Sequence, residues 1–153
     1  MTQTTAQLSA VNAIIEMSSD STSWTDISGH GNVVTVPDQA RETGFKYTFD
    51  GDTAVITAGN RAPIEVDFRV VYTEEAADAF TVVKAAFEAE GGTKYNFRWT
   101  PKGGPVTGNY QYSTGLAIIS SFTYPSVDAA DAAPIMAGWK VTTAKITEAA
   151  YAS

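Results

Sequence analysis

The stretch IEVDFRVVYTEEAADAFTVVKAAFEAEGGTKYNFRWT, residues 64–100, decides the fold class. Its first part alternates, with Glu65, Asp67 and Arg69 placed between apolar side chains. Because successive side chains of a strand point to opposite faces, this pattern predicts a strand over residues 64–72. One face of that strand is expected to pack in the core, and the other to contact water.

A single helix is predicted next, over residues 74–90. Thr73 can cap it, and acidic side chains fill its first turns, where they favour the positive end of the helix dipole. Gly91 and Gly92 end it, because glycine readily adopts the left-handed conformation that follows a helix. The expected buried stripe has the spacing of one helix face and comprises Ala76, Phe80, Val83 and Phe87.

Strands are predicted on both sides of this helix. The longest, residues 110–124, far exceeds a typical strand, so Gly115 is expected to mark a bend or a bulge. Its apolar face is predicted to hold Tyr112, Leu116, Ile118 and Phe122. The order of strands, one helix and more strands differs from the βαβ pattern of nucleotide-binding sheets, and it predicts a mainly β fold, a β-sandwich or barrel with one flanking helix. The other predicted strands are residues 11–17, 24–27, 33–36, 95–100 and 135–146.

Residues 37–62 predict a long β-hairpin that projects from the body. Two alternating segments flank Asp50-Gly51, which is a strong signal for a two-residue hairpin turn. Residues 1–10 are uncharged and aperiodic, and they predict a flexible N-terminal arm. Residues 11–153 are then expected to form one domain, as the total of 153 residues suggests.

The composition excludes several classes of function. The chain has no Cys, which excludes a disulfide framework, Cys-ligated zinc and thiol chemistry. Ten Lys and Arg against 17 Asp and Glu give a net charge of −7, which argues against wrapping nucleic acid through its phosphates. No apolar run approaches the roughly 18 residues of a membrane helix, and residues 1–40 lack the basic region of a signal peptide. We therefore expect no membrane association, and the cytosol of the producing cell as the compartment.

No pattern of residues predicts catalysis, a cofactor or a metal, so we expect a protein that is not an enzyme. His30 is the single histidine, and nothing in the sequence supplies partners for it. Glu65 and Asp67 could act as a carboxylate pair, but Arg69 continues their row and favours a solvated face. A carbohydrate-binding β-sandwich module remains the alternative, with Trp24 or Trp139 as its platform.

Residues 47–104, YTFDGDTAVITAGNRAPIEVDFRVVYTEEAADAFTVVKAAFEAEGGTKYNFRWTPKGG, resemble the central part of the major tail tube protein of long-tailed, siphovirus-like bacteriophages with non-contractile tails. The shared order is a projecting hairpin, a Gly-Asn-Arg-x-Pro segment, a two-faced strand, a short acid-started helix and an aromatic strand. Residues 114–125 (TGLAIISSFTYP) and 134–147 (PIMAGWKVTTAKIT) are similar to the closing strands of that family. The resemblance covers most of the chain after about Val11.

The resemblance implies a structural virion protein with a sandwich-like tail tube fold. Six subunits would form a ring, the rings would stack head-to-tail, and the joined inner sheets would enclose a channel for DNA delivery. The implied partners are further copies of the chain and the tape measure, tail terminator and distal tail proteins, while DNA would pass without specific binding. Assembly would take place in the cytoplasm of the bacterial host, and the final location would be the phage tail.

Two surfaces are expected to serve this assembly. A ring-closed barrel removes exposed strand edges, and a head-to-tail contact that does not close builds a filament. The hydrated strand face is expected to line the channel, through Glu65, Asp67, Arg69, Gln111, Ser113 and Thr142. The hairpin is expected to join stacked rings, through Arg41, Glu42, Lys46, Asp50, Asp52 and Arg61.

Overall fold

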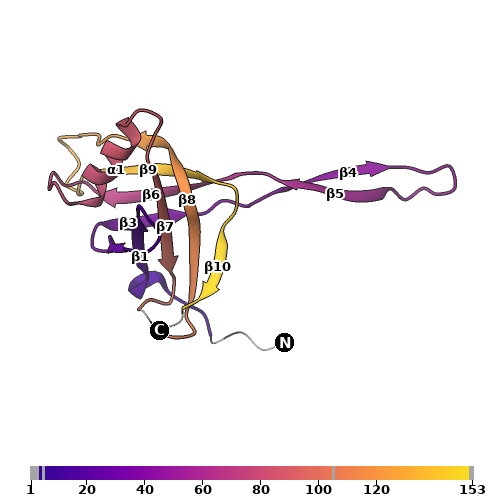
Figure 1. The fold of residues 1–153 in the computed structure, drawn as a ribbon, viewed down its shortest axis with the longest axis horizontal. Coiled ribbons are helices and arrows are strands. Elements are labelled where there is room, and N and C mark those ends of the chain that lie inside the picture. Colours follow the sequence, from indigo (N-terminus) through magenta and orange to yellow (C-terminus); the bar gives the residue numbers. More distant parts are fainter. Residues whose placement is uncertain (1–3, 5, 105, 152–153) are drawn as a thin grey trace.

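A curved antiparallel sheet forms the body of the protein, and a separate two-stranded hairpin projects from it (Figure 1). The structure is a computed structural model, which describes residue 4 and residues 6–104 and 106–151. The strand order in the body is β2-β1-β7-β8-β9-β6-β3, and β10 pairs with β8. The elements are η1 (Ala10–Asn12), β1 (Ile14–Ser18), β2 (Thr25–Asp26), β3 (Gly31–Thr35), β4 (Arg41–Lys46), β5 (Val55–Arg61), β6 (Ile64–Val71), α1 (Ala79–Glu88), β7 (Lys94–Thr100), β8 (Tyr110–Thr123), β9 (Met136–Thr143) and β10 (Thr147–Ala150).

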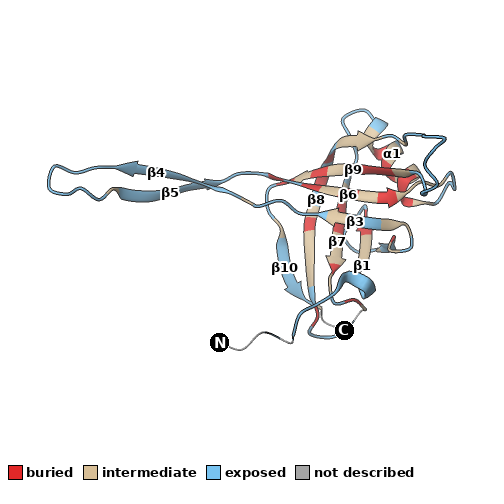
Figure 2. Ribbon diagram, turned by 180° about the vertical axis from the view of Figure 1, so that it is seen from behind, coloured by how far each residue is buried: buried red, intermediate tan, exposed pale blue. Residues whose placement is uncertain are grey.

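The core lies inside the curve of the sheet. The ring centroids of Phe68 on β6 and Phe97 on β7 are 4.8 Å apart, although β8 and β9 separate these strands in the sheet. Trp139 stacks on Phe68 at 5.8 Å, and Phe80 of α1 contacts Phe122 at 5.2 Å, so the helix covers one side of this core. Figure 2 shows the buried residues gathered in the body and the hairpin exposed along its length. The expected mainly β, sandwich-like fold with one helix is confirmed.

The strand predicted over residues 64–72 forms as β6. β6 buries alternate residues, and the side chains between them are half-buried or exposed. The buried set is Ile64, Val66, Phe68 and Val70.

The helix begins later than the sequence predicted. The backbone N–H of Tyr72 donates to Ile135 O at 2.8 Å, which holds the chain extended beyond β6. The Thr73 hydroxyl donates to the Asp78 carboxylate instead of capping a helix, and Ala76 is exposed before the first turn. The rest of the stripe is confirmed, since Phe80 and Val83 are buried and Phe87 is half-buried.

Two bulges divide β8 and reverse its faces. Gly115 has φ +66°, and the pairing with β7 shifts there. As a result Leu116 and Ile118 point away from the core, with half of their surface exposed, so the prediction that they face the core is wrong. Ala117 and Ile119 are buried in their place. A second shift, after Ile119 in the pairing with β9, returns the strand to its first alternation.

The N-terminal strand is shorter than residues 11–17. Residues 10–12 form the 3₁₀ turn η1. Ser9 caps this turn, because its Oγ accepts the backbone N–H of Val11 at 3.4 Å. Val11 is therefore exposed, and pairing begins only at Ile14. Part of the expected arm, residues 1–3 and 5, lies outside the described residues.

The hairpin has the register that an Asp50-Gly51 turn sets. Phe45 lies opposite Ile56, and Lys46 opposite Val55. Regular pairing stops at that last pair, so residues 47–54 form a longer tip than the two-residue turn that the sequence predicted.

Candidate functional site

The face of the sheet that points away from the core carries all the residues expected at a channel. Paired residues of an antiparallel ladder lie on the same side, and the register joins Glu65 to Thr142 and Ser113 to Arg98. We call this surface the polar face. Its expected members are Glu65, Asp67, Arg69, Gln111, Ser113 and Thr142, and the structure adds Glu16, Lys94, Arg98 and Lys140.

Acidic side chains of the polar face are matched by cations. Lys140 Nζ lies 3.6 Å from Glu65 Oε1, and Ser120 Oγ donates to Glu65 Oε2 at 3.2 Å. Arg69 Nε lies 3.2 Å from Asp67 Oδ1, but the hydrogen bond runs from Nη2 to Oδ2 at 3.3 Å, and Oδ1 accepts none. The face is thus charged but locally balanced, which its sequence alone did not reveal.

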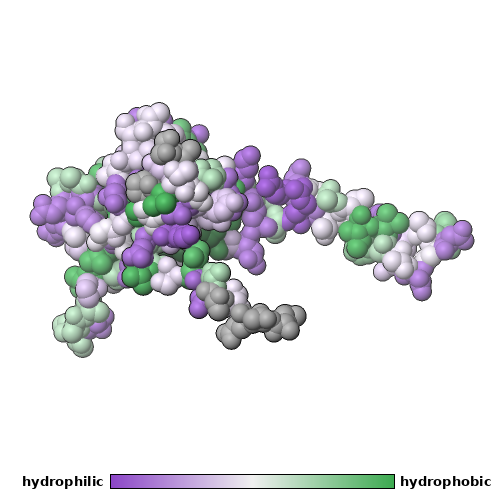
Figure 3. All heavy atoms as spheres, turned by 90° about the horizontal axis from the view of Figure 1, so that it is seen from below, coloured by the Kyte–Doolittle hydropathy of each residue, from purple (hydrophilic) through white to green (hydrophobic). Residues whose placement is uncertain are grey.

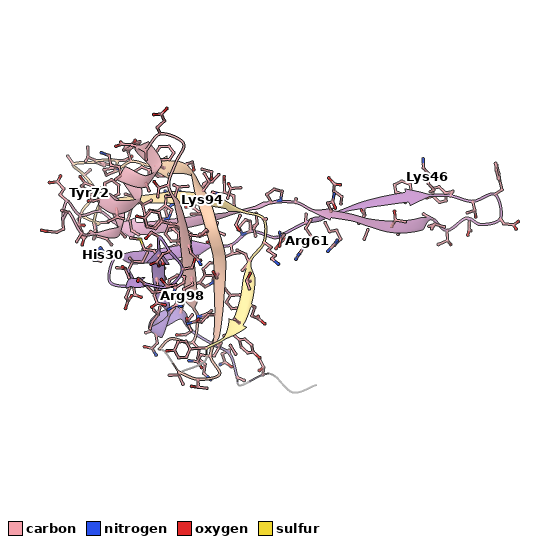
Figure 4. All side chains as sticks on the ribbon, in the orientation of Figure 1. His30, Lys46, Arg61, Tyr72, Lys94 and Arg98 are labelled. Carbon is pink, nitrogen blue, oxygen red and sulfur yellow. The ribbon has the colours of Figure 1, made fainter. Side chains whose placement is uncertain are left out.

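A tighter pair lies at the β1 end of the polar face. Arg98 Nε donates to Glu16 Oε2 at 2.6 Å, and the Arg98 guanidinium lies 3.8 Å from the centre of the Trp24 ring. Both charged side chains are about four-fifths buried. Figure 4 shows Arg98 and Lys94 on the same strand, β7.

Among the described residues, the hairpin contacts the body at its base. Gln39 Nε2 donates to Ala62 O at 3.1 Å and to Ala144 O at 2.7 Å, which fixes the base to the end of β9. Beyond this point every residue of β4 and β5 is exposed, and these strands pair with no other strand in the described chain. An isolated two-stranded ribbon is marginal in water, so this length of hairpin is suited to contact with another molecule.

All the residues expected to join stacked rings lie on the hairpin. Arg41, Glu42 and Lys46 lie on β4, and Arg61 lies opposite Arg41 on β5. The Arg41 guanidinium is partly engaged, since Nη1 donates to Gly59 O at 2.8 Å. Asp50 and Asp52 lie in the tip.

The carbohydrate platform is not present. Trp139 is fully buried between Phe68 and Phe97, and it has no exposed ring for a sugar to stack on. Trp99 packs on Phe68 and Tyr112, and the Trp24 ring is covered by Arg98. The three tryptophans therefore form no common surface.

Other titratable groups serve local structure. The backbone N–H groups of Ser23 and Thr22 hold the pKa of Asp20 well below its usual range. A hydrogen bond with Glu148 raises the pKa of Tyr112, with a further contribution from burial. His30 Nδ1 lies 3.5 Å from Asp78 Oδ2. In the part of the chain that the structure describes, no three His, Asp or Glu side chains come together as a metal site, and no helix is long and apolar enough to cross a membrane.

Comparison with known proteins identifies the fold. No protein-family model and no curated protein matches the sequence. Solved structures match over nearly the whole chain. A chain of the PVC sheath-tube complex of an extracellular contractile injection system, in its extended state, has a TM-score of 0.75 at 13% identity, covering 98% of this chain and 99% of that one.

Two further matches extend this finding. A chain of the PVC sheath/tube terminator has a TM-score of 0.76 at 13% identity, over 96% of this chain and 99% of that one. A chain of the tail of an empty gene transfer agent particle, in C6 symmetry, has a TM-score of 0.61 at 12% identity, over 99% and 100% of the two chains. The protein therefore has the β-sandwich-like tail tube fold found in injection systems and phage-like tails.

Proposed function

We propose that this chain is a tail tube subunit, a structural protein that assembles with copies of itself into stacked rings. One observation carries the proposal: the fold matches end to end at TM-scores of 0.75 and 0.76. Residues 37–62 are 26 of the 153 residues, so a match over 98% of the chain must include the hairpin. An exposed hairpin with no partner in its own chain is explained by contact between subunits.

The finer architecture follows the sequence resemblance. Rings of six subunits stack head-to-tail into the tube of a long phage tail, and tape measure, terminator and distal tail proteins bind along it or at its ends. The tail of the gene transfer agent, solved in C6 symmetry, supports six-fold rings. The subunits assemble in the cytoplasm of the bacterial host, and the protein acts without catalysis.

The polar face lines the channel in this proposal. The location of Glu65, Asp67, Arg69, Gln111, Ser113 and Thr142 on one side of the sheet supports it. Balanced pairs such as Glu65 with Lys140 suit a wall along which DNA slides, because surplus cations would hold phosphates and release counterions.

Assembly is tested by electron microscopy of purified protein at high concentration. The wild type should form rings or tubes. Replacing residues 40–60 by a short Gly-Gly link should leave the body folded, as measured by near-ultraviolet circular dichroism of Trp139, but abolish tubes. Lys84→Ala, at a half-exposed position of α1 outside the hairpin, is the surface control and should assemble normally. Full-length tubes from the deletion variant would contradict a stacking role for the hairpin.

The channel surface is tested separately, by release of DNA from reconstituted particles. Glu65→Lys with Asp67→Lys reverses two charges and leaves Lys140 and Arg69 without their partners. The variant tube should retain DNA at low salt and release it as salt is raised, since the Debye length falls from about 30 Å at 0.01 M to about 8 Å at 0.15 M. Release that is unchanged at low salt from intact tubes would exclude this face from the channel.

A further inference from the structure

The outer half of the hairpin carries an apolar patch that no described part of the chain covers. Phe45 and its cross-strand neighbour Ile56 are 65% and 71% exposed on one face of the ribbon, and Val55, opposite Lys46, is 55% exposed on the other face. Figure 3 shows a hydrophobic segment on the outer part of the hairpin, between a hydrophilic base and tip. The paired cations Arg41 and Arg61 lie on the same face as Phe45. Arg41 is four residues nearer the base of the hairpin, and so about 13 Å from Phe45.

A groove of matching character lies at the opposite end of the body. The hairpin leads into β6 at Ile64, while β9 begins at Met136, opposite Val71 at the far end of β6. The loop from β8 to β9 lines a groove of about 670 Å³ beside Met136. Its apolar wall includes Val127, which is 82% exposed, and Ile135, which is 39% exposed.

The charges of this groove are all negative. Asp128 and Asp131 line it, and residues 124–136 contain no Lys or Arg. One oxygen of each carboxylate accepts a backbone N–H, from Ala130 and from Ala133, at 2.9 Å. These bonds fix the loop and leave the other oxygen of each group to accept from a cation.

We infer that the apolar patch of one copy docks into the β8–β9 groove of the next copy, with Arg41 and Arg61 near Asp128 and Asp131. The inference rests on the proposed tube function and names the surface that receives the hairpin. Apolar side chains meet apolar walls, and cations meet carboxylates. Because the two surfaces lie at opposite ends of the subunit, the contact is heterologous and repeats along a filament.

A second groove fits this role less well. It lies at the base of the hairpin itself, has a volume of about 440 Å³, and is lined by residues that include Val36, Ile64 and Trp99. A hairpin docked there would bring the same ends of two copies together. When both copies exchange hairpins in this way, the contact is two-fold and closes as a dimer, so it would not extend a tube.

Engineered disulfides test the contact directly, because the chain has no native cysteine. Ile56→Cys and Val127→Cys are made in separate proteins, mixed under assembly conditions and oxidised. We expect a dimer band on a non-reducing gel from the mixture and from neither protein alone. One chain with both substitutions should give a ladder, since every subunit then supplies both partners. Ile56→Cys mixed with Val106→Cys, a site in another loop that is 56% exposed, is the control and should give no band.

A charge exchange tests the polar part of the contact. Arg41→Glu should raise the concentration needed for assembly about tenfold, and adding Asp128→Arg should restore it. Tubes that form without the crosslink between positions 56 and 127 would overturn the inference and leave the proposed function standing. Crosslinking of Ile56→Cys to itself would also overturn it, in favour of the two-fold contact. A chain that forms neither tubes nor crosslinks would overturn both.

Discussion

Replacing Gly115 by Ala should destabilise the subunit by about 1 kcal/mol. Gly115 has φ +66° in the first bulge of β8. An L-residue in this left-handed region costs about 1–2 kcal/mol. A Cβ added there meets no atom within 4 Å, so the cost is backbone strain without a clash. Alanine also lowers the conformational entropy of the unfolded chain, which stabilises the fold by about 0.4–1 kcal/mol. The net loss of stability is therefore about 1 kcal/mol.

Three further variants separate strain from crowding. Gly115→Asn should cost less than Gly115→Ala, because Asn tolerates left-handed backbone. Gly138→Ala should cost about 3 kcal/mol, since its Cβ would overlap the carbonyl oxygen of Phe68 on the paired strand β6. Gly29→Ala, with open space around its Cβ and no left-handed backbone, should be neutral or slightly stabilising.

Urea unfolding of the monomer, followed by tryptophan fluorescence, measures these differences as shifts of midpoint at constant m-value. The expected order of stability is Gly29→Ala, Gly115→Asn, Gly115→Ala and Gly138→Ala. If Gly115→Ala were as stable as Gly29→Ala, the backbone at Gly115 would not be left-handed. The reversal of faces that exposes Leu116 and Ile118 would then lose its cause.

Three other changes have defined outcomes. Arg98→Met removes the contacts with both Glu16 and Trp24 and should cost about 1–2 kcal/mol in urea, more than Arg98→Lys, which keeps the charge; equal losses would contradict this. The pKa of Asp20 is lowered in the folded state, so its carboxylate stabilises the fold above the unfolded pKa of about 3.9, and this stabilisation is lost as pH falls through the folded pKa. The melting temperature of Asp20→Asn should therefore fall less steeply on acidification than that of the wild type. An equal slope would refute this. Deleting residues 1–8 should change the monomer melting temperature by less than about 2 °C while altering assembly, and a large loss of monomer stability would place this arm in the core.

Sequence patterns predicted β6 well because its two sides differ along its whole length. One side packs on the aromatic core and the other meets water, so the alternation of Val66 and Asp67 records the environment directly. The hairpin register was also predictable, since the observed pairing of Phe45 with Ile56 is the one expected for a turn centred on Asp50-Gly51.

The faces of β8 and the start of α1 were not predictable, because both depend on distant strands. Gly115 correctly marks the bulge, but periodicity alone places Leu116 in the core, because the shift of register is seen only in the pairing with β7. The acidic residues after Thr73 suit a helix N-terminus, yet Ile135 holds Tyr72 extended. The pair of Glu65 with Lys140 likewise becomes visible only when the register of β6 and β9 is known.

Because the hairpin is isolated, the backbone amides of the subunit fall into two groups that differ in their protection from hydrogen exchange. Within the described residues, β4 and β5 pair only with each other, whereas β9 lies between β8 and β6. Opening of the hairpin costs little and leaves the body intact, so its amides exchange with deuterated water long before those of β9. An unfolding curve of the free subunit therefore reports on the body alone. Slower amide exchange at β4 and β5 during assembly therefore measures when a neighbouring subunit covers these strands.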